Sequence, residues 1–277
     1  MGTPDFICIG AQKAATSWLA ANLAHHPDIW LPFTKELHFF DPQVEGSIPH
    51  WRRRHANRLA ALIERAKANG ARKRVAYLEG LTGEDFILTE AWYRKVFAHR
   101  PAGRMTGEFT PRYATLPAAS IDQMLSIAPD ARFIYLIRDP VARAISNFRM
   151  DLAFKSPEPP SPEFIESFAR RWTGARRYTS SDYADHIPRW DAKLDPERLL
   201  YLPFGEVKAD PRRVLARVER FLGLAPFAAY PKAERRVNRT AEIALPDWLR
   251  PHLEADLARH RAFLEARFPP AFFARIA

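Results

Sequence analysis

The stretch FICIGAQKAATSWL, residues 6–19, decides the fold of this chain. Its apolar start predicts a buried strand over residues 6–10, and the pattern that follows predicts a helix over residues 16–24. A tight turn between such elements aims backbone amides and the positive end of the helix dipole at one point, which attracts an anion. Lys13 adds a mobile cation to this turn. We therefore expect a strand, a phosphate-binding turn and a helix.

The spacing of this turn differs from that of the Walker A loop of ATPases. That loop requires Gly-x4-Gly-Lys-Ser/Thr, whereas here Lys13 follows Gly10 by three residues and is succeeded by Ala14 and Ala15. The turn must reach its conformation without a glycine at either alanine position. Taken alone, the pattern is equally typical of a plain strand–helix connection with an exposed lysine.

A second group of anion-binding residues follows the clearest interior strand, residues 132–137. Arg138 comes directly after that strand, and parallel sheets bind ligands at the carboxyl ends of their strands. Asp139 is a typical N-cap for the next helix, on which Arg143 and Ser146 are three residues apart and share a face. The arginines and the hydroxyl predict a receptor for a second phosphate. The alternative is a salt bridge that caps the helix.

A candidate proton acceptor lies in the segment KELHFFD, residues 35–41. If this segment is extended, Glu36 and His38 project to the same side. Either side chain could then take a proton from an acceptor hydroxyl or amine. The alternative interpretation is that both are surface polar residues beside an apolar Phe39-Phe40 plug.

Strands and helices alternate along the rest of the chain. This alternation predicts a central parallel sheet covered on both faces by helices, in a single α/β domain of residues 1–277. The further strands that we expect span residues 105–109, 132–137 and 199–203, and the further helices span residues 52–68, 90–98, 162–172, 183–194, 211–222 and 246–268.

Composition narrows the class of ligand. The formal net charge is +10, which suits anionic ligands, but no long Lys/Arg tract like a nucleic-acid-binding arm occurs. The single cysteine, Cys8, is expected to be a buried small hydrophobe, and one cysteine with scattered histidines excludes a Cys–His zinc cluster. The sequence shows neither a signal peptide nor an apolar run long enough to span a membrane. We therefore expect a cytoplasmic protein, and the oligomeric state is not determined.

The three segments together resemble the sulfotransferases that use 3′-phosphoadenosine 5′-phosphosulfate (PAPS). The greatest likeness is to the branch of the heparan sulfate glucosaminyl sulfotransferases and of many bacterial sulfotransferase-domain proteins. Residues 10–16 resemble the family's 5′-phosphosulfate loop, residues 138–146 its 3′-phosphate motif, and residues 36–41 the segment of its catalytic glutamate. The resemblance spans nearly the whole chain and implies a fold similar to that of the P-loop NTPases.

The resemblance also implies roles for individual residues. Lys13 would stabilise the leaving phosphate, Glu36 would be the general base, and His38 would lie beside the acceptor. Arg138 and Ser146 would hold the 3′-phosphate. The nucleotide-binding residues that the resemblance implies are Gln12, Lys13, Ala14, Ala15, Thr16, Ser17, Arg138, Ser146 and, as a weak version of the family's Gly-Arg loop, Asn238 and Arg239.

The predicted activity is in-line sulfuryl transfer from PAPS, without a metal, to a hydroxyl or amine of a small-molecule or glycan acceptor. A carbohydrate or glycolipid fits this description, and phenols and amines stay open. The first alternative is a P-loop small-molecule kinase that uses Mg-ATP. The second is a non-catalytic nucleotide- or RNA-binding protein, which the lack of a nucleic-acid-binding motif disfavours.

Overall fold

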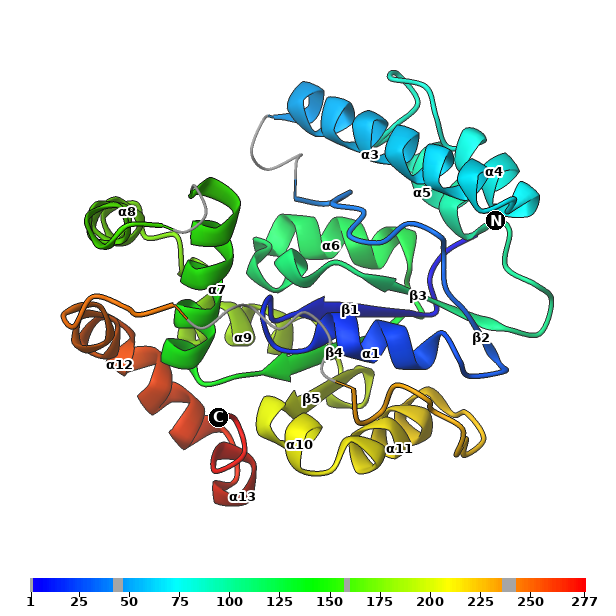
Figure 1. Ribbon diagram of the computed structural model, residues 1–277. Coiled ribbons are helices and arrows are strands. Elements are labelled where there is room, and N and C mark those ends of the chain that lie inside the picture. The colour runs from blue at the N-terminus through cyan, green and yellow to red at the C-terminus, as the bar shows by residue number, and fades with distance from the viewer. Residues whose placement is uncertain (1, 42–46, 157–159, 236–242) are drawn as a thin grey trace.

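Five parallel strands form the centre of the protein (Figure 1). The structure is a computed structural model that describes residues 2–41, 47–156, 160–235 and 243–277. The order of the strands across the sheet is β2-β3-β1-β4-β5, which confirms the predicted α/β class with a central parallel sheet. The strands are β1 (Phe6–Gly10), β2 (Ile29–Trp30), β3 (Met105–Phe109), β4 (Arg132–Ile137) and β5 (Leu199–Pro203).

The order of the strands places the two predicted phosphate-binding segments next to each other. β1 and β4 are neighbours, with Gly10 in register with Tyr135. From β1 the chain continues to β2 at one edge of the sheet, and from β4 it continues to β5 at the opposite edge. Such a switch in direction opens a crevice at the carboxyl ends of the two strands, where open α/β sheets bind ligands.

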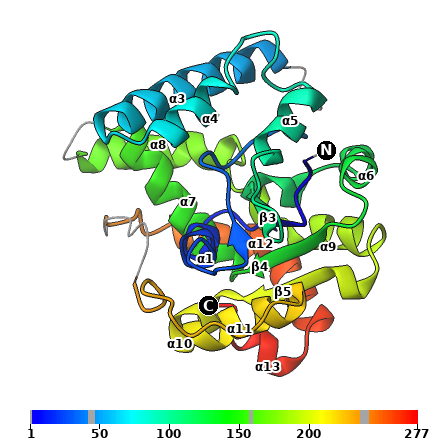
Figure 2. The same ribbon diagram turned by 90° about the vertical axis from the view of Figure 1, so that its right-hand side faces the viewer.

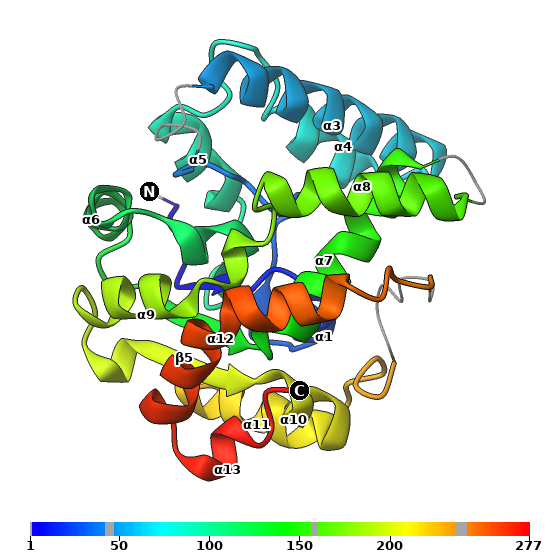
Figure 3. The same cartoon turned by 90° about the vertical axis from the view of Figure 1, so that its left-hand side faces the viewer.

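Helices cover both faces of the sheet and the carboxyl ends of its strands. Figure 2 shows α1 on one face and α6 and α9 on the other. Figure 3 looks toward the carboxyl ends of the strands, where α7, α8 and α12 lie in front. The helices are α1 (Thr16–Leu23), α3 (Ile48–Ala68), α4 (Arg72–Glu79), α5 (Glu90–Phe97), α6 (Ala118–Ile127), α7 (Pro140–Lys155), α8 (Pro162–Gly174), α9 (Tyr183–Asp191), α10 (Phe204–Ala209), α11 (Pro211–Leu222), α12 (Leu249–Arg267) and α13 (Pro270–Phe273). Short 3-10 turns η1 (Pro111–Thr115), η2 (Thr179–Ser181) and η3 (Pro196–Arg198) join some of them.

The apolar residues of the strands form the main core. Every residue of β1 is buried, and Cys8 among them is fully buried, which confirms that it serves as a small hydrophobe. Burial raises the pKa of its thiol to about 12, so it stays protonated and unreactive. A second apolar cluster joins α7, α8 and α12. In the described part of the chain, no helix is both long and apolar enough to cross a membrane.

The predicted strand limits agree with the structure, and those of most helices agree to within a few residues. Asp139 caps α7 as expected, because its carboxylate accepts from the N–H of Ala142 at 2.8 Å. Four helices and one strand were not predicted: α4, α6, α10, α13 and β2. Strand β2 is only two residues long and exists through pairing with β3, which no local pattern can reveal.

Candidate active site

The turn after β1 adopts its shape without a glycine at positions 14 and 15. Lys13 and Ala15 both have φ of 69°, in the left-handed region, where a side chain costs about 1–2 kcal/mol. Gly10 is required for a different reason, because a Cβ there would lie 2.8 Å from Cβ of Ala114. Backbone conformations of this cost typically persist at functional sites.

The turn presents several backbone donors. Within the described ranges, the N–H groups of Gln12, Lys13 and Ala15 donate to no other protein group. The first N–H groups of α1, beginning at Thr16, have no partner inside the helix, as at any helix N-terminus. Together with the helix dipole, these donors form an arrangement that favours an anion.

Arg138 connects the two predicted phosphate-binding segments. Its Nη1 donates to the carbonyl oxygen of Lys13 at 2.7 Å, and its guanidinium carbon lies 4.4 Å from the centre of the Phe204 ring. Burial lowers the pKa of Lys13, and neighbouring Arg138 lowers it further. Burial likewise lowers the pKa of Arg138. Two partly buried cations this close together gain stability from an added anion.

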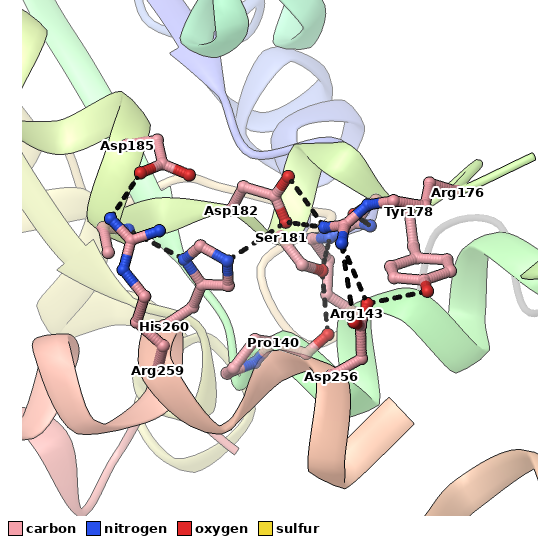
Figure 4. Close-up of polar contacts among 11 residues, drawn as sticks. Pro140, Arg143, Arg176, Tyr178, Ser181, Asp182, Asp185, Asp256, Arg259 and His260 are labelled. Atoms are coloured by element: carbon pink, nitrogen blue, oxygen red, sulfur yellow. Dashed lines mark hydrogen bonds and ion pairs between the residues drawn. The ribbon is translucent and has the colours of Figure 1, made fainter. Parts of the chain in front are cut away.

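Arg143 uses two of its three guanidinium nitrogens inside the protein, whereas its buried Nη1 has no partner among the described residues. Its side chain is fully buried. Its Nε donates to Ser181 Oγ at 2.5 Å, its Nη2 donates to the carbonyl of Tyr178 at 2.9 Å, and Ser181 Oγ donates to the carbonyl of Pro140 (Figure 4). Arg143 therefore holds the start of α7 against η2. Ser146 lies one turn further along α7 and is half-buried.

We expect Arg143→Ala to lower the free energy of unfolding by about 2–4 kcal/mol, because it leaves buried partners unpaired and opens a void. Urea denaturation measures the change. The matched control is Arg259→Ala, which removes an exposed arginine paired with Asp185 and should change stability by less than about 1 kcal/mol. Equal effects of the two substitutions would contradict the structural role of Arg143.

The segment of Glu36 and His38 is not extended, which corrects the sequence expectation. Both residues have left-handed φ, 56° and 47° respectively. Strand β3 and the residues after it hold the segment instead: the N–H of Glu36 donates to the carbonyl of Phe109 at 2.9 Å. The N–H of Leu37 donates to Thr110 Oγ1 at 3.0 Å. A segment with these torsions depends on such external contacts.

Lys35 joins this segment to the turn after β1. Its Nζ donates to Ser17 Oγ at 2.9 Å and lies 3.5 Å from Glu36 Oε1. No role for Lys35 was predicted from the sequence. Only its position next to Glu36 indicates that it could belong to the site. The structure thus brings the candidate base and the candidate phosphate-binding turn together through one ammonium group.

His38 is oriented by two neighbours. Its Nδ1 lies 2.6 Å from Asp41 Oδ2, and its ring lies 4.5 Å from the ring of Trp51 on α3. Asp41 is buried and lies 3.4 Å from Nε of Arg112. With the Nδ1 proton donated to Asp41, Nε2 of His38 is left to contact another group.

Helix α3 reaches the site through Arg58, which the sequence interpretation also missed. Its Nη1 donates to the carbonyl of Glu36 at 3.3 Å, and burial lowers its pKa. No local pattern distinguishes Arg58 from the other arginines of this basic helix. Asn238 and Arg239, which the resemblance placed over the nucleotide, lie outside the described residues.

A further polar cluster lies at η2, α9 and α12. Among the described residues, Asp182, Asp185 and His260 could together offer ligands to a metal ion. Arg176 already binds Asp182, and Arg259 binds Asp185 (Figure 4). Their guanidinium groups supply the positive charge that a cation would otherwise provide, so this cluster carries no assignment as a metal site.

Comparisons with known proteins identify the family of this chain. The model of the sulfotransferase family matches residues 4–229. The chain belongs to this family. A crystal structure of a sulfotransferase from Alicyclobacillus acidocaldarius has a TM-score of 0.67 and 25% identity, with 99% of this chain and 100% of that chain covered. The predicted sulfotransferase fold is thereby confirmed.

Curated members of the sulfotransferase family are also similar. Human heparan sulfate glucosamine 3-O-sulfotransferase 3B1 is 28% identical over 226 residues, which are 80% of this chain and 46% of that protein. The bifunctional heparan sulfate N-deacetylase/N-sulfotransferase 1 of Caenorhabditis elegans is 24% identical over 235 residues, 82% of this chain and 23% of that protein. The chain spans about half the length of the first relative and about a quarter of the second.

Proposed function

We propose that this sulfotransferase moves the sulfuryl group of PAPS to a hydroxyl or amine of an acceptor by in-line displacement. The observation that carries the proposal is the contact of Lys35 with both Ser17 and Glu36. It places a carboxylate that can accept a proton beside a turn that can hold an anionic donor. The alternative of a small-molecule kinase has no comparable support from the family.

The donor is bound in two places in this proposal. The free amides of the turn, with Lys13, Thr16 and Ser17, hold the 5′-phosphosulfate. Arg138 and Ser146 hold the 3′-phosphate, because they follow β4, the strand next to β1. A guanidinium is well suited to this task, since it offers several donors in a fixed plane.

The chemical step uses a base on one side and cations on the other. Glu36 takes the proton of the acceptor as its oxygen or nitrogen attacks sulfur, and His38 lies beside the acceptor. The bond from sulfur to the bridging phosphate oxygen breaks, and its electron pair stays on the departing nucleotide. Lys13 and the amides of the turn stabilise that charge. The scheme requires no metal, because the sulfuryl group carries less charge than a phosphoryl group.

A carbohydrate is the acceptor class that we propose. The relatives named above are heparan sulfate glucosamine and heparan sulfate N-sulfotransferases. Helix α3 contacts the segment of Glu36 through Arg58 and carries exposed Arg53 and Arg54. A basic helix next to the candidate base favours an anionic glycan over a neutral phenol.

Isothermal titration with the nucleotide product PAP, with 5′-AMP and with Mg-ATP tests the donor. We expect PAP to bind about 10- to 100-fold more tightly than 5′-AMP, because hydrogen bonds to a charged group contribute about 1.5–3 kcal/mol. Binding of Mg-ATP without a preference for PAP would refute the proposal and support the kinase. Strongly salt-dependent binding of RNA instead would support the nucleic-acid alternative.

A further inference from the structure

Glu108 of β3 is a buried carboxylate that the scheme above does not use. Only 2% of its surface is exposed. Tyr93 OH donates to its Oε2 at 2.5 Å, Thr110 Oγ1 donates to its Oε1 at 2.8 Å, and Tyr113 also hydrogen-bonds to it. Burying a charged carboxylate costs free energy, which the hydrogen bonds from the three hydroxyl groups offset.

Two of these hydroxyls also hold the segment of Glu36 and His38. Thr110 Oγ1 accepts from the N–H of Leu37 at 3.0 Å, and Tyr113 OH accepts from the N–H of Phe39 at 2.9 Å. A hydroxyl has one proton to donate and lone pairs that accept. Because the carboxylate takes both protons, the lone pairs of both hydroxyls are directed to the segment.

The two anchored amides alternate with the two candidate catalytic residues. Leu37 follows Glu36 and Phe39 follows His38, and both candidate residues have left-handed torsions. This part of the chain belongs to neither a helix nor a strand, and the carbonyl of Phe109 at the end of β3 is a further backbone anchor for it. The direction in which both side chains point therefore depends in part on the two hydroxyls and on the carboxylate that orients them.

We propose that Glu108 is a positioning residue that sets Glu36 and His38 for reaction with the acceptor, acting through the hydroxyls of Thr110 and Tyr113. This inference rests on the proposed function, which gives Glu36 and His38 their roles in the reaction. A loss of positioning by even 1 Å can lower turnover by about 10²-fold.

The protonation state of Glu108 makes this role dependent on pH. Burial raises the pKa of Glu108 to about 7, against hydrogen bonds from Tyr93, Tyr113 and Thr110 that lower it, and neighbouring Asp41 raises it further. Above pH 7 the carboxylate is charged and accepts from all three hydroxyls. Below pH 7 it gains a proton and becomes a donor, so one hydroxyl must turn and the anchoring weakens. Activity should therefore fall as the pH drops through about 7.

The test compares the full-length protein with its Glu108→Gln variant. Turnover is measured between pH 5.5 and 9 with PAPS and the acceptor that reacts fastest with the wild type, from a panel of heparan-type glycan, glycolipid, phenol and amine. We expect kcat at pH 8 to fall by about 10- to 100-fold, and the change in activity near pH 7 to disappear. PAP affinity should stay the same. Amide hydrogen exchange at Leu37 and Phe39 should become faster.

A matched variant separates positioning from structural support. Tyr93→Phe removes a hydroxyl that donates to the same carboxylate rather than to the segment, and it keeps the ring that stacks on Phe39. Because the hydrogen bond from Tyr93 lowers the pKa of Glu108, its loss should move the midpoint of the activity profile to higher pH while kcat at pH 9 stays near wild type. Tyr113→Phe should lower kcat, and its effect should not add to that of Glu108→Gln.

Unchanged kcat and unchanged exchange at Leu37 and Phe39 in a folded Glu108→Gln variant would overturn the inference. If that variant does not fold, the Tyr93→Phe profile decides, and a midpoint that does not move overturns it. Failure of the wild type to bind PAP and transfer sulfuryl groups refutes the proposed function instead. In that case the exchange data still show whether Glu108 holds the segment.

Discussion

Lys13→Ala is expected to lower kcat for sulfuryl transfer from PAPS by about 10²–10⁴-fold. Negative charge builds up on the departing phosphate as the bond to sulfur breaks, and Lys13 belongs to the turn that faces it. Burial and Arg138 both lower the pKa of Lys13, so the ammonium gains stability as that negative charge develops. The substitution keeps a Cβ at φ of 69°, so the backbone cost of this position does not change.

Steady-state kinetics with PAPS and titration with PAP measure this effect. We expect kcat to fall more than PAP affinity does, because the charge is larger in the transition state than in bound PAPS. Lys73→Ala, which removes an exposed lysine of α4, is the matched control and should behave as wild type. A folded Lys13→Ala protein with kcat within about threefold of wild type would exclude the proposed role.

Glu36→Gln is expected to lower kcat by about 10²–10⁴-fold. The amide has nearly the same shape as the carboxylate and can still accept from the Lys35 ammonium. It cannot take a proton from the acceptor. PAP affinity should therefore stay near that of wild type while turnover falls.

The control for this substitution is Glu64→Gln on α3, where an exposed carboxylate pairs with Lys67. It removes a carboxylate without approaching the turn after β1, so kcat should not change. His38→Gln distinguishes the two candidate bases. Full turnover in Glu36→Gln together with loss of turnover in His38→Gln would transfer the role of base to His38.

The strands and most helices could be predicted because their signals are local. Residues 6–10 and 133–137 are continuous apolar runs, as expected of strands buried on both faces. Asp139 precedes a proline at the start of α7, which is a local capping signal. Strand β2 was missed because two residues carry no periodicity. Helix α6 has a local signal that the sequence prediction missed, which is the helical spacing of its buried residues Ile121, Met124 and Ile127.

The candidate site could be proposed in part for the same reason. Gly10, Lys13, Arg138 and Glu36 follow strand ends or lie in motifs of fixed spacing, so the sequence could name them as candidates. The internal contacts of Arg143 could not be predicted, because its spacing from Ser146 says nothing about burial, and the structure places its Nε against Ser181, 38 residues away.

The sequence by itself determined the parallel α/β fold, the turn after β1 and the sulfotransferase resemblance, because these depend on residues within a few positions of one another. Only the tertiary structure decided how the turn and Glu36 are joined. Lys35 reaches Ser17 across 18 residues, and the N–H of Phe39 reaches Tyr113 across 74. Such contacts arise from the order of the strands in the sheet, which brings distant segments to one edge and leaves no periodic pattern in the chain.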